Sequence, residues 1–434
     1  MPTSMTMRPL TGLACSVLVG GLGVAYAAAP AAAGGATLDV ATTGSDANSG
    51  TADAPLRTVQ EAIDRATPGT TIRLHKGTYS QELEIRSSGS AGAPITVTAA
   101  GDGPVTVTSA QAPDGCGARQ PSSRRTINVS GGADYWTFTG LTIVNGVYIN
   151  GEGTGKTYAW HAGLAKKGQW EPRRKVPGTS KNDPVAAKGA VPYLANLLHA
   201  DLDPSEHIEF IGNTMTGRGI YATLANYGVV KDNTITNILC GTGPGVWVMN
   251  FSNFWEVSGN DISKIAASTW KHYMQEGIRF GSAANYNRIV GNTVHDLPGD
   301  GRAFNTDVDG SFNLFQNNIA TNVAIGFNDQ MAGWGNTWVG NRASKYRTYC
   351  FGFRLKDATL RTPSLNSSTN MSTISNNTCS SPVSGAPALG IGAVMKSSFN
   401  ANTFPKVMLG TYVPGYWAKQ GNTWNGSSKP PAEG

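Results

Sequence analysis

The chain has 434 residues, a formal net charge of +6, 54 glycines and only 14% charged residues. This composition argues against a helical bundle, while 40% hydrophobic residues are enough to fill a core. An all-β protein with many turns is therefore expected.

Residues 1–33 have the features of a signal peptide. Arg8 precedes an apolar stretch rich in Leu, Val, Gly and Ala, and Ala25 and Ala27 place small residues at a cleavage site. No later stretch approaches the roughly 20 continuous apolar residues that cross a membrane. We therefore expect a secreted, extracellular mature chain over residues 34–434 that does not enter a membrane.

The next segment predicts a short helix before the first strands. Leu56, Val59, Ile63 and Ala66 fall on one helical face, so this helix can cover the exposed end of a stack of coils. Strands are then expected from Ile72 and from Leu83 onward.

The same region contains four motifs that resemble the opening of right-handed parallel β-helix proteins of the pectate-lyase-like superfamily: Gly44–Thr51, Pro55–Ile63, Pro68–Ile72 and Lys76–Tyr79. The resemblance implies a solenoid of β coils with an N-terminal capping helix. It also implies a place among polysaccharide lyases and related enzymes, although this architecture supports several activities.

A recurring asparagine marks short β-rich units throughout the rest of the chain. Successive markers lie about 20 to 36 residues apart, a period that indicates a solenoid. Apolar residues alternate just before the marker, as in Ile208–Ile211, and an asparagine tolerates left-handed bends while its amide can bond the asparagine of the next coil. We interpret these asparagines as structural. They are Asn213, Asn233, Asn260, Asn292, Asn318, Asn341, Asn377 and Asn402.

Residues 151–206 interrupt this rhythm and predict a long basic and aromatic loop insertion. Eight Lys or Arg residues lie between Lys156 and Lys188 against two acids, an excess that equals the net charge of the chain. Such a patch concentrates anionic ligands, so we expect Arg173, Arg174 and Lys175 to bind a polysaccharide that is anionic. A solvated loop without a ligand is the alternative, and nucleic acid fits less well because no known binding module surrounds the patch.

Four cysteines remain after the signal peptide: Cys116, Cys240, Cys350 and Cys379. In an oxidising compartment they can form up to two disulfides, and the sequence leaves all three pairings open.

Alignment of the coils on their asparagines predicts one outer face that carries polar residues. The residue after a buried Ile, Val or Phe points outward, and the residue two positions further shares that face. The expected members of this face are Trp247, Arg279, Asn305, Asp307, Asn328, Gln330, Arg354 and Lys356.

This face could carry out β-elimination on a uronic acid polymer, which requires a base for the proton alpha to the carboxylate and a group that neutralises the carboxylate. Lys356 is the candidate base, with its pKa lowered by Arg354 and Arg279, and either arginine could hold the carboxylate. His272 and Tyr273 are candidate proton carriers in an insert that we expect to lie over the same face. Trp247, Asn305, Asn328 and Gln330 are candidate substrate-binding residues.

The acids of this region support two further predictions. Asp307, Asp309 and Asp329 offer hard oxygen ligands that suit Ca²⁺. Alternatively, two carboxyl groups among these residues and Asp300, with His295 nearby, could act as the acid and base of an inverting glycoside hydrolase. A uronate epimerase and a non-catalytic glycan-binding surface protein also remain open.

Overall fold

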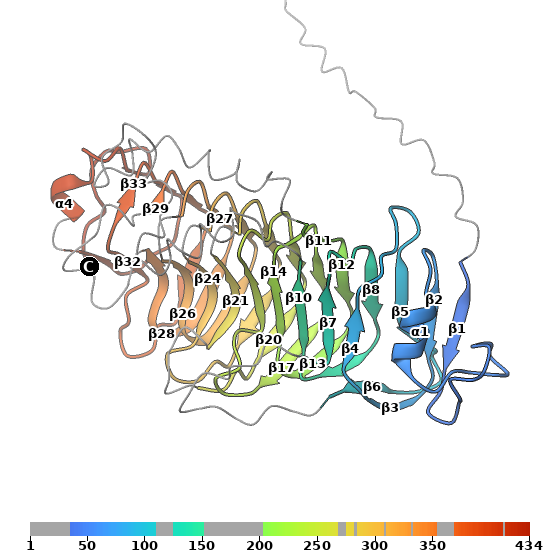
Figure 1. Cartoon of the computed structure of the whole chain (residues 1–434). Coiled ribbons are helices and arrows are strands. Elements are labelled where there is room, and N and C mark those ends of the chain that lie inside the picture. Colours follow the sequence, from blue (N-terminus) through green and yellow to red (C-terminus); the bar gives the residue numbers. More distant parts are fainter. Residues whose placement is uncertain are drawn as a thin grey trace, which may run out of the picture.

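A computed structural model describes residues 35–109, 125–151, 203–267, 275–281, 284–307, 310–330, 333–353, 369–410 and 413–434. These residues form a right-handed parallel β-helix whose coils stack in one continuous row, with the N-terminal coils at one end and the C-terminal coils at the other (Figure 1). The predicted fold class is confirmed.

One side of the stack is a parallel sheet to which successive coils contribute one strand each. Within the described residues it has thirteen strands. They are β1 (Thr37–Val40), β2 (Thr71–Leu74), β5 (Ile95–Ala99), β8 (Trp136–Thr139), β12 (Ile208–Ile211), β16 (Val229–Lys231), β19 (Glu256–Ser258), β22 (Arg288–Val290), β25 (Leu314–Gln316), β27 (Thr337–Val339), β30 (Thr373–Ser375), β34 (Ser398–Asn400) and β36 (Thr423–Trp424).

A second sheet contains two parallel series of strands, which two long strands join into one. The first series is β3 (Gly77–Ser80), β6 (Val105–Thr108), β9 (Thr142–Val144), β13 (Thr214–Gly217), β17 (Thr234–Ile238), β20 (Asp261–Ser263), β23 (Thr293–His295) and β31 (Thr378–Ser380). The second is β4 (Leu83–Ile85), β7 (Ile127–Ser130), β10 (Val147–Asn150), β14 (Ile220–Thr223), β18 (Val246–Met249), β21 (Glu276–Phe280), β24 (Arg302–Thr306), β32 (Leu389–Ile391) and β35 (Val407–Leu409). The joining strands are β26 (Ile319–Asp329) and β28 (Arg342–Phe353).

Residues from all the strand series fill one continuous apolar core between the sheets. Aromatic rings of successive coils stack in it, as Phe304 does on Phe327 and Phe327 on Phe351, with centroids 5.1 and 4.6 Å apart. Because side chains alternate along each strand, the intervening residues point away from this core.

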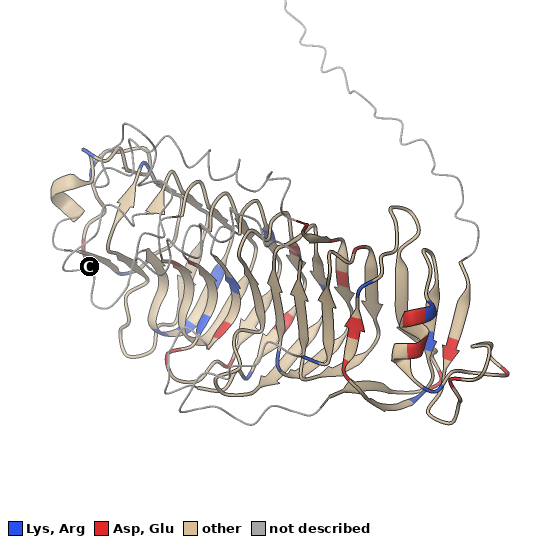
Figure 2. Ribbon diagram, in the orientation of Figure 1, with Lys and Arg blue, Asp and Glu red and all other residues tan. Residues whose placement is uncertain are grey.

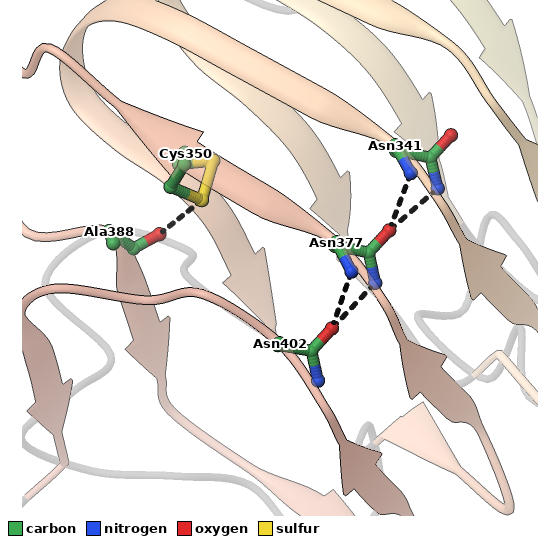
Figure 3. Close-up of a disulfide and its surroundings, with 6 residues drawn as sticks. Asn341, Cys350, Asn377, Ala388 and Asn402 are labelled. Carbon is green, nitrogen blue, oxygen red and sulfur yellow. Dashed lines mark hydrogen bonds between the residues drawn. A yellow bond between two sulfur atoms is a disulfide. The ribbon is translucent and has the colours of Figure 1, made fainter.

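The eight marker asparagines form an uninterrupted ladder, as the sequence predicts. Asn341 donates its backbone N and its Nδ2 to Oδ1 of Asn377 at 2.9 and 3.0 Å, and Asn377 repeats both bonds to Asn402 (Figure 3). The left-handed backbone, however, belongs to the residue before the asparagine, such as Gly212 or Asp232. Glycine, Asp or Asn fits there because these residues adopt positive φ at low cost.

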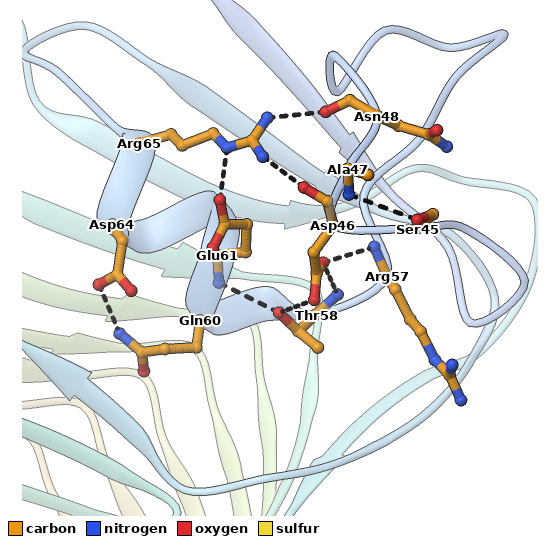
Figure 4. Close-up of polar contacts among 10 residues, drawn as sticks. All are labelled: Ser45, Asp46, Ala47, Asn48, Arg57, Thr58, Gln60, Glu61, Asp64 and Arg65. Carbon is orange, nitrogen blue, oxygen red and sulfur yellow. Dashed lines mark hydrogen bonds and ion pairs between the residues drawn. The ribbon is translucent and has the colours of Figure 1, made fainter.

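The predicted capping helix is α1 (Val59–Arg65), at the N-terminal end of the stack (Figure 1). Its predicted apolar face is buried against the first coils. Thr58 caps the helix by accepting a hydrogen bond from the backbone N of Glu61, and Asp46 accepts bonds from the backbone N of both Arg57 and Thr58 (Figure 4). These bonds join the motif around Asp46 to the helix.

Two short strand pairs and a helical turn complete the described elements: β11 (Ser205–Glu206) with β15 (Ala225–Asn226), β29 (Thr369–Asn370) with β33 (Val394–Met395), and α4 (Val413–Tyr416). Of the predicted loop insertion, Ser205–Glu206 pair with Ala225–Asn226, whereas residues 152–202 lie outside the described residues, so the insertion itself stays a prediction. No helix of the described residues is long and apolar enough to span a membrane.

Cys350 and Cys379 form a disulfide between neighbouring coils, with their Cα atoms 5.9 Å apart (Figure 3). Cys240 is also disulfide-bonded, and its partner lies outside the described residues.

Candidate active site

The outer surface of the second strand series carries the row of polar residues that the sequence predicts, and we call this surface the site face. Strand pairing aligns Tyr148 with Tyr221, Tyr221 with Trp247, Trp247 with Arg279, Arg279 with Asn305, and Asn305 with Asn328. Each residue follows a buried core residue and therefore points outward. The row runs along the stack across β10, β14, β18, β21, β24 and β26.

A buried ion-pair cluster occupies the middle of the site face. Arg279 donates from Nη1 to Oε2 of Glu276 at 2.9 Å and from Nη2 to Oδ2 of Asp307. Glu276 has no exposed surface, and Arg279 and Asp307 are each 6% exposed. Basic and acidic segments also meet around β21 and β24 in Figure 2. One guanidinium group therefore holds two carboxylates within hydrogen-bonding reach of itself.

The local chain geometry explains why Glu276 reaches the site face. Gly277 follows it at a corner of the coil, where an added Cβ would lie only 2.5 Å from Val294 Cγ1 in the core. Gly277 therefore takes the inward position at this corner, as does Ile278 after it. Glu276 and Arg279, which flank these two residues, both lie on the outer surface.

A second arginine and three amides extend the cluster toward β26. Arg302 Nη1 donates to Gln330 Oε1 at 2.6 Å and lies 3.7 Å from Glu276 Oε1. Asn328 Nδ2 donates to Asn305 Oδ1 at 2.5 Å. Asn305 Nδ2 is buried without a hydrogen-bond partner, so this donor is available to an acceptor on a ligand.

Burial is the main influence on the pKa of Glu276. Complete burial raises the pKa of Glu276 and Asp307 adds to this effect, while Arg279 and Arg302 oppose it, and the pKa remains above its ordinary value. Oε1 of Glu276 is buried and makes no hydrogen bond within the described site. A proton on this oxygen would therefore not be held by another acceptor of the described residues. With Glu276 neutral, two guanidinium groups face one carboxylate, and the cluster carries a net positive charge.

Trp247 lies in the row between Tyr221 and Arg279. Its ring stacks on Tyr221 with centroids 4.6 Å apart, and Arg279 Cζ lies 5.7 Å from the ring centroid. Since neighbouring coils cover both of its faces, Trp247 cannot be a flat platform for a sugar. Its buried indole N–H, which has no hydrogen-bond partner, is the group that it can offer to a ligand.

The predicted register of the site face is correct through Asn328 and wrong in the following coil. Membership of Arg354 in the row requires Phe353 to lie over Phe327, but the structure pairs Phe327 with Phe351 and Asn328 with Gly352. A register shift between β26 and β28, which inserts an extra residue in β28, accounts for the difference.

The two described members of the predicted calcium site do not come together. Asp307 lies on the site face beside Arg279, whereas Asp329 aligns with Thr306 and Phe280 in the inward positions. Asp329 is 1% exposed and accepts a hydrogen bond from Asn336 Nδ2 at 3.2 Å. No group of three potential metal-ligating side chains occurs in the described parts of the chain. These residues do not fit a Ca²⁺ site, and we derive no catalytic step through this ion.

His295 and Asp300, the other residues of the predicted hydrolase site, lie apart from the ion-pair cluster. His295 on β23 bonds Asp296 at 2.8 Å and Asp261 at 3.0 Å, so it bridges neighbouring coils. Asp300 is exposed in the turn that leads to β24. No described contact links either residue to Glu276.

Several predicted site residues lie outside the described residues, so their roles remain predictions. They are Arg173, Arg174, Lys175, His272, Tyr273, Asp309, Arg354 and Lys356.

Sequence reasoning missed Glu276 and Arg302, which contribute half of the charged cluster. Both immediately precede a small residue, in Glu276–Gly277 and Arg302–Ala303, and Arg218–Gly219 repeats the pattern. A charged residue directly before the small corner residue is the signal that could have identified them.

Residues 38–160 match the protein family described as "Pel9A-like, right handed beta helix region". Pectate lyase PEL9 of Emericella nidulans is 35% identical over 119 residues, which cover 26% of this chain and 29% of the relative. Uncharacterized protein YwoF of Bacillus subtilis is 44% identical over 59 residues, or 14% of this chain and 13% of the relative. The chain thus matches less than a third of the length of these relatives.

Among solved structures, an alginate lyase from Paenibacillus sp. str. FPU-7 is 18% identical with a TM-score of 0.48, and the alignment covers 77% of this chain and 95% of that one. Pectate lyase Pel9A is 15% identical with a TM-score of 0.44, over 86% and 77% of the two chains. A lacto-N-biosidase from Eubacterium ramulus is 12% identical with a TM-score of 0.49, over 86% and 68%. The N-terminal coils are thus similar in sequence to the Pel9A-like β-helix region.

Proposed function

We propose that the protein is a secreted enzyme that cleaves an acidic polysaccharide, with Glu276 as the proton donor. The observation that carries this proposal is the state of Glu276: it is fully buried on the site face, its pKa is raised, and Oε1 makes no hydrogen bond. A carboxylic acid whose pKa is raised can protonate a leaving oxygen at a higher pH than an ordinary one.

An anionic substrate is favoured by the groups around this acid. Arg279 and Arg302 outnumber Asp307 once Glu276 is neutral, and the unpartnered groups at Trp247 Nε1 and Asn305 Nδ2 are both donors. Hydroxyl and carboxylate oxygens of a uronate are acceptors that complement such a surface. The similarity of residues 38–160 to a Pel9A-like region, and the relative named as a pectate lyase, agree with this substrate class.

β-Elimination is the reaction that this arrangement supports best. A base removes the proton alpha to the uronate carboxylate, the C–O bond to the leaving sugar breaks as a C=C bond forms, and Glu276 gives its proton to the departing oxygen. Asn305 Nδ2, which has no hydrogen-bond partner in the described site, can donate to the carboxylate as negative charge develops. Lys356, outside the described residues, is the proposed base.

Hydrolysis is a second candidate because Glu276 and Asp307 share one guanidinium group. Two carboxyl groups that lie near each other can act as the acid and the base of a glycoside hydrolase, and inverting enzymes hold them about 6.5 to 9.5 Å apart. In this reaction Asp307 would have to leave Arg279 to activate water, a rearrangement that elimination does not need.

Secretion is supported by the N-terminal sequence and by the disulfide between Cys350 and Cys379, since disulfides persist in oxidising compartments. We place the enzyme outside the cytoplasm on these grounds.

A screen of uronic acid polymers with the full-length mature chain tests the reaction. Elimination creates a conjugated double bond that absorbs in the ultraviolet, and we expect this absorbance to grow with the number of new chain ends. New reducing ends without ultraviolet absorbance would favour hydrolysis, and cleavage confined to neutral polymers would overturn the proposed substrate class.

A further inference from the structure

Two more arginines lie on the site face, toward the N-terminal end of the stack from Glu276. Arg125 lies two residues before Ile127, the first residue of β7, and Arg218 two residues before Ile220, the first of β14. Strand pairing places Arg218 two coils from Glu276, with Pro244 between them. At about 4.8 Å per coil, the two backbone positions are about 10 Å apart, a span that an oligosaccharide covers.

Arg125 is buried, and no described residue supplies a counter-charge to it. It is 4% exposed, its Nε has no hydrogen-bond partner, and its guanidinium group forms no ion pair with any described residue. Buried arginines in folded proteins are normally paired, because an isolated charge is costly to remove from water. A buried guanidinium group without a carboxylate among the described residues indicates that an anion completes it.

A second positive charge lies close to this group. Burial and then repulsion by Arg218 lower the pKa of Arg125 to about 9, so Arg125 remains charged at neutral pH. Tyr148 and Tyr221 are near enough to interact electrostatically with the same guanidinium group, and their rings stack with centroids 5.2 Å apart. Two buried cations and two aromatic residues therefore converge on one part of the site face.

We propose that Arg125 and Arg218 form a binding site for one anionic group of the sugar chain, a carboxylate or a sulfate ester, with Arg218 two coils and Arg125 four coils from the proton donor. Arginine suits either group because its planar fork binds two oxygens at once. Tyr148 and Tyr221, on the coils of β10 and β14, lie beside this site. The inference rests on the proposed function for its substrate, whereas the presence of an anion site can be tested without turnover.

The first test uses inorganic sulfate as the probe and Arg125→Met as the variant. At constant ionic strength, millimolar sulfate in place of chloride should raise the Tm of the wild-type protein by about 2 °C or more, since a ligand that binds only the folded state stabilises it. Arg125→Met should lose this shift and should be as stable as the wild type, or more stable, without sulfate. Arg288→Met, which replaces an exposed arginine on β22, should retain the shift.

The second test measures affinity for oligosaccharides in the Glu276→Gln background, so that no probe is consumed. Arg125→Met should weaken the binding of an oligogalacturonate at least tenfold if the site takes carboxylates, or that of a sulfated oligosaccharide if it takes sulfate esters. Absence of a sulfate-dependent Tm shift in the wild type, an equal shift in Arg125→Met, or a large loss of stability in that variant would overturn the proposal. If the protein cleaves no polymer in the screen but shows the sulfate-dependent rise in Tm, the anion site is supported and only the proposed function is wrong.

Discussion

The asparagine ladder and the site face run along the same coils but are built differently. Along the ladder the same residue recurs from Asn213 to Asn402, and each amide both accepts from one neighbouring coil and donates to the other. Along the site face, tyrosine, tryptophan, arginine and asparagine follow one another. Trp247 Nε1 and Asn305 Nδ2 there lack hydrogen-bond partners among the described residues, and the carboxyl group of Glu276 is buried on the same face.

The contrast separates two uses of a repeated backbone. A side chain that hydrogen-bonds to the same residue type in the next coil contributes to stability in every coil, because buried polar groups must be hydrogen-bonded. Positions that change from coil to coil cannot satisfy one another in this way, and their unsatisfied groups and buried charges cost stability. Substitutions on the two surfaces should therefore affect different properties.

The largest expected effect comes from Glu276→Gln on the site face. The amide cannot donate a proton as an acid, so kcat should fall by about 10² to 10⁴-fold on the polymer that the screen identifies. In the wild type, kcat should decline as pH rises through the raised pKa of Glu276, since only the protonated form is active. Steady-state kinetics across pH will measure both effects.

Stability provides a second readout for Glu276. Because the folded chain binds this proton more tightly than the unfolded chain, the contribution of Glu276 to the free energy of unfolding decreases as pH rises from the ordinary glutamic acid pKa through the raised folded value. Glu276→Gln should remove that decline. Glu256→Gln, at an exposed carboxylate on β19, is the matched control, and an unchanged kcat in Glu276→Gln would exclude this residue as the proton donor.

Asn292→Ala tests the ladder. Asn292 Oδ1 accepts from the backbone N and Nδ2 of Asn260 at 3.0 and 2.8 Å, and both donors are buried. Leaving them unsatisfied should lower the free energy of unfolding by about 2 to 4 kcal/mol, measured by urea denaturation. KM should be unchanged under conditions where the protein remains folded.

The control for the ladder is Asn425→Ala, because Asn425 Oδ1 accepts a bond from Ala401 N at an exposed position. Its substitution should cost less than about 1 kcal/mol. If the two alanine variants were equally destabilised, burial of the ladder would not be the source of its stability.

The smallest effect is expected at His295, which belongs to neither surface. Partial burial lowers the pKa of His295, but its hydrogen bonds to Asp296 and Asp261 outweigh this and raise it above the ordinary value. The stabilisation is therefore fully present below the ordinary histidine pKa and disappears as pH rises through the raised folded value. His295→Asn should lower the free energy of unfolding by about 0.5 to 1 kcal/mol near pH 5.5 and much less near pH 9.

A double-mutant cycle with Asp261→Asn identifies the interaction at His295. Coupling between the two residues should be measurable at the acidic pH and vanish at the alkaline pH. Equal destabilisation at both pH values would show that His295 acts through packing alone.

The fold was predictable because its determinants recur in sequence. The asparagine markers and the alternating apolar residues carry the coil register locally, and they identified Trp247, Arg279, Asn305 and Asn328 as one outer row. Phe353 misled the alignment because Cys350–Phe353 contains two phenylalanines, and only the pairing across the register shift shows that Phe351 is the one over Phe327.

The chemistry of the site was less predictable. Arg279 was expected to hold a substrate carboxylate, yet its guanidinium group is bound to Glu276 and Asp307. Sequence spacing shows that residues share a face, but it does not show which charges neutralise one another or which remain buried. Glu276 and Arg125 are informative because of burial, a property that arises only when neighbouring coils pack around them.

Parallel stacking in register also makes the dimensions of the site discrete. Trp247, Arg279 and Asn305 lie on consecutive coils, so any two of them are separated by a whole number of steps of about 4.8 Å. Insertion of one coil between β18 and β21 would lengthen the distance from Tyr221 to Glu276 by one step. A β-helix can therefore change the distance between a binding site and the reacting residues by a whole coil, and the residues that perform the reaction stay the same.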